Sequence, residues 1–167
     1  SQYVIMIVGV LVLADMWTVN KRYLNNDNFA RKRKVEIPYQ ATQADQQILR
    51  DIDPNFKVFN QSVSTFNDAS TSYFHKSIGG YHGAKLKRYQ ELIENHIAKG
   101  NMGVLNMLNA KYFITPKGQA QQNPSALGNA WFVDTINIVP NADAEIAALN
   151  GFNPANTAIL DARFSEQ

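Results

Sequence analysis

The sequence predicts an α/β or α+β domain, in which a small mixed β-sheet of about four short strands is packed against helices. Short runs of β-branched and aromatic residues alternate with segments whose apolar residues recur at helical spacing. The chain has 167 residues, of which 45% are hydrophobic and 18% charged, so it is long and apolar enough to form one ordinary core. An apolar segment precedes this domain.

The N-terminal segment 3–14 is an uninterrupted run of apolar residues. A membrane span needs about 20 such residues, so we interpret this run as the end of a truncated transmembrane helix. Trp17 and Lys21 follow where a span would meet the lipid headgroups. A buried β-branched strand and a core helix are the alternative structures. Without a bilayer, the apolar surface of residues 3–14 predicts self-association of the chain.

We therefore divide the chain into residues 1–24, the end of a span with its juxtamembrane entry, and residues 25–167, a single domain. A basic cluster follows the span, and most such clusters are solvated loops. Near a membrane, however, it is also a candidate site for lipid phosphates. The cluster consists of Arg31, Lys32, Arg33 and Lys34.

Thr42 has the character of an N-cap residue, with Asp45 three positions later, and opens a helix that we expect to reach Ile52. Residues 56–59 alternate as a short strand, and residues 62–72 are polar enough to form a loop.

The best helix signal begins at Gly83 or Ala84, and its apolar face extends to Ile97. Gly100 is a natural terminator, and Asn101 is the expected cap of a second helix. This second helix carries no basic side chain, so we predict no nucleic-acid partner.

Beyond these helices, strands are predicted over residues 112–115, 131–139 and 157–160. The pattern of the middle strand shifts phase near Asp134, which predicts a bulge or two short strands. Residues 117–128 are polar and predicted to be a long connection, and Asn141 is the expected cap of a short helix.

The segment Ser72–Gln90 holds aromatic residues, two histidines, a Gly-Gly pair and four Lys/Arg residues, but no carboxylate. A glycine-rich loop that leads into a helix N-terminus can hold an anion, because backbone N–H groups and the helix dipole both favour negative charge there. We predict a ligand site in this segment, and a purely structural role is the alternative. The candidate residues are Tyr73, His75, Lys76, Gly79, Gly80, Tyr81, His82, Lys85 and Arg88.

Several kinds of chemistry are not indicated. The chain has no cysteine and only three histidines, none at metal-binding spacing, so we predict no metal site and no cofactor. Nucleophile elbows and phosphate-binding loops are missing from the sequence, and we predict no catalytic residue. Asp51 and Asp53 form a carboxylate pair that we interpret as helix-end polarity rather than glycosidase machinery.

Three segments of the chain form a distinctive set: SYFHKSIGGYHGAKLKRYQ at 72–90, VLNMLNAKYFI at 104–114 and LGNAWFV at 127–133. Together they resemble the YfhO family of bacterial membrane proteins. Asp15-Met16-Trp17 and the following Lys21-Arg22-Tyr23-Leu24 are also similar to the end of a span in that family. The match covers nearly the whole chain in the same order.

The resemblance implies a large polytopic protein of the bacterial cytoplasmic membrane, similar to C-type glycosyltransferases that use polyprenyl-phosphate sugars. It implies that this chain is an extracytoplasmic soluble domain, and that the acidic catalytic residues lie in an early loop outside it. The expected function is binding of a glycan or a polyprenyl-phosphate-linked sugar during envelope glycosylation. The alternative is a non-catalytic structural or interaction domain that orders the membrane portion or a partner. A free-standing soluble enzyme is the least expected function.

Overall fold

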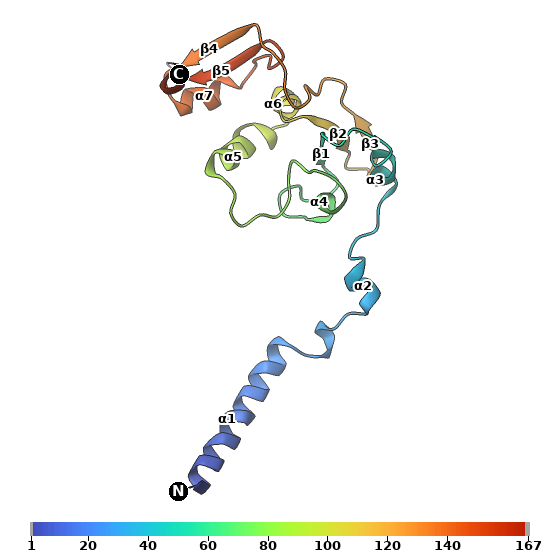
Figure 1. Ribbon diagram of the computed structural model, residues 1–167, viewed down its shortest axis with the longest axis vertical. Coiled ribbons are helices and arrows are strands. Elements are labelled where there is room, and N and C mark those ends of the chain that lie inside the picture. Colours follow the sequence, from blue (N-terminus) through green and yellow to red (C-terminus); the bar gives the residue numbers. More distant parts are fainter. Residues whose placement is uncertain (1, 166–167) are drawn as a thin grey trace. The chain divides into compact units, whose positions relative to one another are not determined.

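The computed structural model describes residues 2–165, apart from the side chains of Arg33 and Lys34. Contacts between residues divide the chain into two compact units, Ser1–Gln40 and Ala41–Gln167 (Figure 1). We refer to them as the first and the second unit and describe each by itself.

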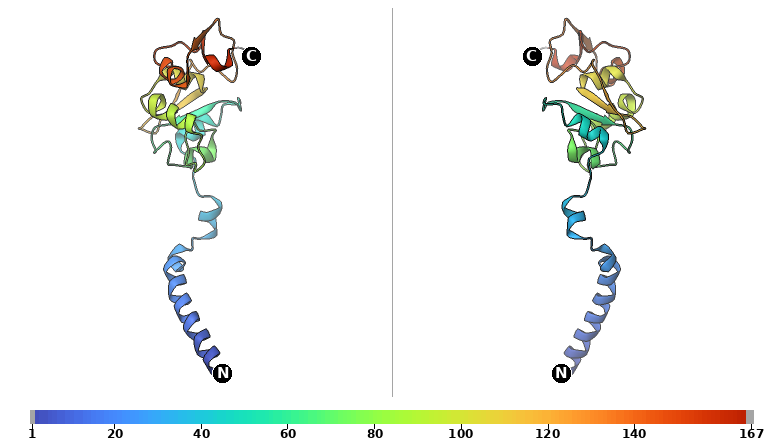
Figure 2. Two further views of the ribbon diagram at one scale, coloured as in Figure 1. Left: turned by 90° about the vertical axis from the view of Figure 1, so that its left-hand side faces the viewer. Right: turned by 90° about the vertical axis from the view of Figure 1, so that its right-hand side faces the viewer.

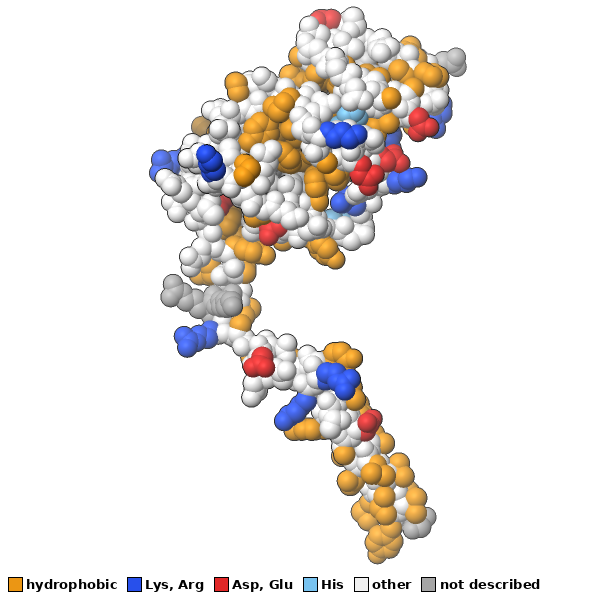
Figure 3. All heavy atoms as spheres, turned by 180° about the vertical axis from the view of Figure 1, so that it is seen from behind, with side chains coloured by type: hydrophobic (Ala, Val, Ile, Leu, Met, Phe, Trp, Pro, Cys, Tyr) orange, Lys and Arg blue, Asp and Glu red, His pale blue; other side chains and the backbone are white. Residues whose placement is uncertain are grey.

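The first unit is dominated by α1 (Gln2–Tyr23), which both views in Figure 2 show as one continuous helix. None of its described residues is buried, and hydrophobic side chains cover it along most of its length (Figure 3). A buried strand and a buried core helix are therefore both wrong for residues 3–14. Within the described residues, the stretch Gln2–Asn28 is long and apolar enough to cross a membrane, a test that signal sequences also pass.

Two short helices follow α1. The 3₁₀ helix η1 (Asn26–Asn28) is closed by a capping box from Asn25, and α2 (Lys32–Glu36) contains three of the four residues of the basic cluster. Lys32 Nζ lies 3.7 Å from a carboxylate oxygen of Glu36, one helical turn away.

The second unit contains two small sheets, as far as the described residues show. In one sheet, β1 (Lys57–Asn60) pairs in parallel with β2 (Ala110–Ile114), which pairs antiparallel with β3 (Ala120–Gln122). In the other, β4 (Thr135–Val139) pairs in parallel with β5 (Thr157–Asp161). The predicted mixed α/β class is confirmed.

Local capping signals fix several helices of the second unit. The side chain of Thr42 accepts the N–H of Asp45, and the side chains of Asn101 and Asn141 accept N–H groups in the first turns of later helices. All three predicted caps are confirmed. The helices are α3 (Gln43–Ile48), α4 (Ser70–Phe74), α5 (Lys87–Leu92), the π-helix η2 (Ile93–Ile97), α6 (Met102–Met107), α7 (Ala142–Ala148) and the 3₁₀ helix η3 (Ala162–Phe164).

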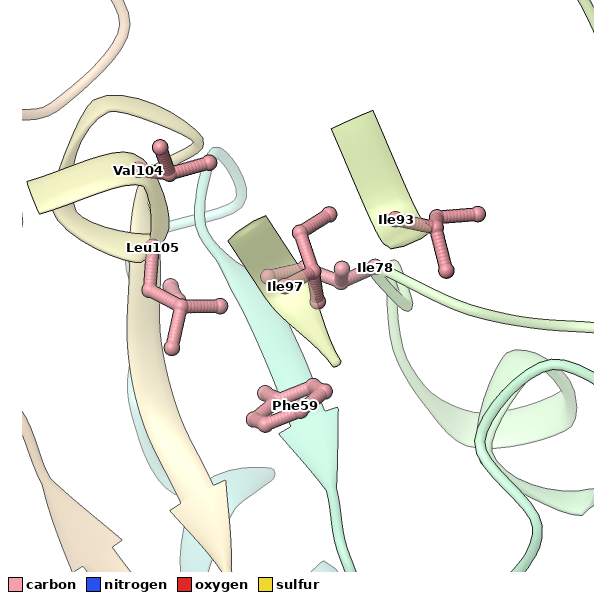
Figure 4. Packing of buried hydrophobic residues seen from close by; sticks show 7 residues of the cluster. Phe59, Ile78, Ile93, Ile97, Val104 and Leu105 are labelled. Atoms are coloured by element: carbon pink, nitrogen blue, oxygen red, sulfur yellow. The ribbon is translucent and has the colours of Figure 1, made fainter. Parts of the chain in front are cut away.

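Strand β1 is buried on both faces. Phe59 points into a core formed with residues of α6, η2 and the segment before α5 (Figure 4). Its neighbour Val58 points to the opposite face, as the alternation of a strand requires, and packs with Ala44, Ile48 and Ile114. Figure 4 labels the larger core as Phe59, Ile78, Ile93, Ile97, Val104 and Leu105.

Three predicted boundaries are wrong for a shared reason. The helix expected from Gly83 begins at Lys87, and the helix from Thr42 ends at Ile48, before the fully exposed Ile52. The strand expected over 131–139 begins at Thr135, where the sequence pattern changes phase. In each case the local pattern extends over apolar residues that the structure leaves exposed, namely Ile52, Leu86 and Phe132, so burial supports only a shorter element.

Two elements occur in segments predicted to lack regular structure. Strand β3 lies in the polar stretch 117–128, where its backbone pairs with β2 through a turn closed by the Thr115 N–H donating to Gln119 O. Helix α4 lies at the end of the predicted loop 62–72, where Asp68 accepts the backbone N–H of Ser70. Both elements depend on backbone pairing and polar contacts, which hydrophobic periodicity does not indicate.

The packing of Gly79 yields a stability prediction. A Cβ at this position would overlap the carbonyl oxygen of Thr65, whereas a Cβ at Gly83 would meet open space. We expect Gly79→Ala to lower the free energy of unfolding by on the order of 3 kcal/mol, because the backbone must move apart.

Urea unfolding of the two variants in detergent measures the difference. Gly83→Ala is the matched control, since its φ is not in the left-handed region and its surroundings are open. Equal midpoints for Gly79→Ala and the parent chain would show that this close approach is not formed.

Candidate functional site

His75, from the predicted ligand segment, lies inside the second unit. Its Nε2–H donates to Asp45 Oδ1 at 2.9 Å, and the two side chains are only 2% and 8% exposed. The other oxygen of Asp45 accepts from the backbone N–H and the hydroxyl of Thr42 at 2.8 and 2.7 Å. His75 therefore fixes the segment to the capping box of α3 and has no free face for a ligand.

The segment next to His75 acts as an additional edge for β1. The N–H of Val58 donates to Lys76 O at 2.8 Å, and the N–H of Ile78 donates to Val58 O at 3.1 Å. The Lys76 ammonium donates to Pro54 O at 2.7 Å. These bonds cover the edge of β1 opposite β2.

The glycine pair allows close backbone approach. Gly79 lies against Thr65, and the N–H of Gly80, at a φ of +115°, donates to Thr65 O at 2.7 Å. The hydroxyl of Tyr89 donates to Ile78 O at 2.5 Å and draws the start of α5 onto the same loop. These contacts explain why both positions are glycines, and the helix that was expected to begin near Gly83 begins at Lys87 instead.

The other candidate residues of the predicted ligand segment are exposed or form contacts with residues close in the chain. Tyr81 and His82 are exposed, and His82 Nδ1 accepts the Ala84 N–H at 3.1 Å. Lys85 donates to Gln90 at 3.1 Å, with its Nζ 5.4 Å from the ring centroid of Phe66.

Tyr73 is half exposed and stacks edge to face on Phe74. The nine candidates thus do not surround one cavity. Arg88 alone among them lines the large groove described next.

In the basic cluster, Arg31 and Lys32 are exposed, as a lipid-phosphate site would require. The side chains of Arg33 and Lys34 lie outside the described residues.

A groove of about 1010 Å³ runs along the second unit. Helix α5 lines it with Tyr89 and Leu92, and α7 and β5 contribute further lining residues. The segment between β3 and β4 contributes Trp131, whose Nε1–H donates to Pro154 O at 2.8 Å. Sequence reasoning missed this groove. Its lining is mainly apolar and aromatic, and includes Met107, Val133, Ile146, Leu149, Phe152, Ile159 and Phe164.

Two arginines lie at the groove. Arg88 Nη2 donates to Glu145 at 2.6 Å, and the Arg88 side chain is 73% exposed, so most of its donors face solvent. Arg163 donates through Nε and Nη2 to the fully buried carboxylate of Asp161. These hydrogen bonds are the main reason that the pKa of Asp161 is lowered below its usual value and that of Arg163 is raised.

The buried side chain of His96 holds the α7 wall in place. Its Nε2–H donates to Ile146 O at 2.7 Å, and its Nδ1 accepts from the amide of Asn101 at 3.1 Å. The same amide donates to Leu149 O at 3.0 Å. Side chains from η2 and the start of α6 thereby satisfy carbonyls at the C-terminal end of α7.

A separate ion cluster surrounds Lys111. Its ammonium lies 2.7 Å from Asp51 and 3.2 Å from Asp53, and 5.2 Å from the ring centroid of Phe56. The hydroxyl of Tyr112 donates to Asp51 at 2.8 Å. Asp51 and Asp53 are therefore paired with a cation, and their role is to connect the end of α3 to β2.

No family model, curated protein or solved structure matches this chain.

The His75–Asp45 bond gives a second prediction. Replacing His75 with Ala leaves a buried carboxylate oxygen without its donor, so we expect the free energy of unfolding to fall by about 2 kcal/mol. His82→Ala, which changes an exposed ring in the same segment, should stay within about 0.5 kcal/mol of the parent. Urea unfolding followed by circular dichroism distinguishes the two, and equal losses would contradict an interior role for His75.

The Lys111 cluster gives a third prediction, on pH. The pKa of Asp51 is lowered from 3.8 to about 2, chiefly because Lys111 donates a hydrogen bond to it. A carboxyl group whose pKa is lower in the folded state stabilises the fold above its unfolded pKa, and this stabilisation is lost as pH falls through the folded pKa.

Urea midpoints should therefore drop between about pH 4 and pH 2 in the parent chain. In Asp51→Asn this part of the drop should disappear, while the midpoint at neutral pH should already be lower. An unchanged acid profile in Asp51→Asn would remove Asp51 as the titrating group.

Proposed function

We propose that this chain is a non-catalytic extracytoplasmic domain of a membrane-embedded, glycosyltransferase-like protein of bacteria, and that its groove binds a polyprenyl-phosphate-linked sugar. The observation that carries the proposal is the groove itself, whose apolar and aromatic walls meet two arginines. The resemblance of residues 72–90, 104–114 and 127–133 to the YfhO family supplies the type of protein. This placement of the ligand differs from the one expected from sequence, because only Arg88 belongs to both sites.

The groove suits a ligand with two chemical characters. Trp131, Phe152 and Phe164 offer aromatic faces for sugar rings or isoprenoid methyl groups. A phosphate group is matched by a guanidinium, which donates two parallel hydrogen bonds. Arg88 uses one nitrogen for Glu145, so a phosphate would bind its remaining donors or displace that carboxylate.

The first unit supports attachment to a membrane. At 1.5 Å per residue, the 22 residues of α1 extend about 33 Å, close to the thickness of a bilayer's hydrocarbon core. Lys21 lies 5.5 Å from the ring centroid of Trp17 at the C-terminal part of the helix, where a span meets the headgroups. In this proposal α1 crosses the cytoplasmic membrane, and the exposed Arg31 and Lys32 meet lipid phosphates.

A second candidate function is a structural or interaction domain without a ligand. One observation favours it: the most distinctive residues of the 72–90 segment, His75 and Gly79, are explained by internal packing. The domain would then order the membrane portion of the protein or a partner, and the groove would stay free of phosphate ligands.

A titration distinguishes the two functions and is our fourth prediction. The chain has two tryptophans, so Trp17→Phe leaves Trp131 in the groove as the only one. With this chain in lipid nanodiscs, dimethylallyl phosphate should change the Trp131 fluorescence in a saturable way, and inorganic phosphate should act more weakly.

Arg88→Gln should weaken this binding about tenfold, as expected for the loss of a charge-assisted hydrogen bond. Lys87→Gln is the matched control, because Lys87 is the exposed neighbour of Arg88 and does not line the groove. Ligand binding in the groove would be contradicted if the Arg88→Gln chain bound dimethylallyl phosphate as tightly as the Lys87→Gln control. It would also be contradicted if the Trp131 fluorescence stayed constant at millimolar dimethylallyl phosphate.

A further inference from the structure

The two-stranded sheet of β4 and β5 has an unusual structure. Parallel strands normally lie inside larger sheets that are covered on both faces, and two strands alone are marginally stable. Figure 1 shows β4 beside β5, which pairs with it in parallel. Within the described residues β4 has no other strand neighbour, so one of its edges is free.

The backbone groups at this free edge can be assigned. The N–H of Thr135 donates to Asn156 O at 3.0 Å, toward β5. Because backbone groups alternate along a strand, Asn137 also faces β5, and the N–H and C=O groups of Ile136 and Ile138 face outward. Neither isoleucine has a backbone partner on that side among residues 2–165. Their side chains are also exposed, by 61% and 56%.

Natural proteins usually protect such an edge with a charge, a proline or a bulge. The sequence of strand β4 is Thr-Ile-Asn-Ile-Val, which contains neither a charged residue nor a proline. Its register with β5 is regular, so it has no bulge there. It is neutral, rich in β-branched residues and nearly symmetric about Asn137. A strand of this kind is complementary to itself when two copies run antiparallel.

We propose that β4 is a homodimer interface, at which a second copy of this chain adds its own β4 antiparallel, with the twofold axis at Asn137. Ile136 of one copy then faces Ile138 of the other, and each pair exchanges both backbone hydrogen bonds. Thr135 faces Val139 of the other copy in a non-hydrogen-bonded pair, so no charged residue of β4 meets another. The two sheets join into one, and the four isoleucines form a continuous apolar stripe.

This register makes a specific geometric prediction. The two copies of Asn137 form a non-hydrogen-bonded pair, in which Cα atoms lie about 4.5 Å apart. That distance falls within the range that a disulfide bridges, about 4.4 to 6.8 Å. The natural chain has no cysteine, so a single introduced thiol reports on one position only.

The test is oxidative crosslinking of the full chain in detergent micelles, our fifth prediction. We expect Asn137→Cys to form a covalent dimer at least about tenfold faster than Gln121→Cys. The control residue is exposed on β3, a strand that also has a free edge within the described part of the chain. Equal rates would overturn the proposal, because association through residues 3–14 or random collision should crosslink both positions alike.

A second variant tests the register. Adding Ile136→Lys and Ile138→Lys to Asn137→Cys puts like charges opposite each other across the interface, and crosslinking should fall to the rate of the control. Both side chains are exposed, so the fold should keep its circular dichroism spectrum. Crosslinking that persists at the original rate would contradict pairing through β4. Residues 135–139 do not line the groove, so the phosphate titration is unaffected by either outcome.

Discussion

The groove of the second unit depends on the buried hydrogen bonds of one histidine. A helix ends with carbonyl groups that have no partner within the helix, and these are costly to bury. In α7, the side chains of His96 and Asn101 satisfy two such carbonyls. These bonds join the layer formed by β4, α7 and β5 to the rest of the second unit. They also connect α7, which lines the groove, to η2, which continues α5, another element that lines it.

The π-helical form of η2 is part of this arrangement. Its wider turn is closed by the Ala98 N–H donating to Ile93 O, and the Asn101 N–H donates to His96 O over the same spacing. Ile93 and Ile97 face the core, and His96, between them in the chain, is also buried and reaches α7.

The sequence allowed prediction of features that depend on neighbouring residues. Thr42, Asn101 and Asn141 bond to N–H groups within three positions, so their patterns are visible in the chain. The strands β1 and β5 were found to within one residue, because β-branched and aromatic side chains mark them. The polar strand β3 was missed, since only its backbone pairing with β2 defines it.

The candidate site was less predictable, because its partners are distant along the chain. His75 is 30 positions from Asp45, and nothing near either residue indicates that they meet. The groove combines side chains between Leu86 and Phe164, from elements whose packing no local pattern reveals. A segment rich in His, Lys and Gly therefore indicated an anion site, although half of these residues are used for internal contacts.

Photocrosslinking in membranes tests most directly whether the groove, and not the loop of residues 73–85, is the ligand-binding face. A polyprenyl phosphate carrying a diazirine in its first isoprene unit would be irradiated with the membrane-bound chain, and the labelled peptides would be identified by mass spectrometry. Binding in the groove should place labels near Trp131 and Ile159, which line it, and these labels should be lost when excess dimethylallyl phosphate is present. Labels confined to residues 73–85, or to α1 alone, would contradict it.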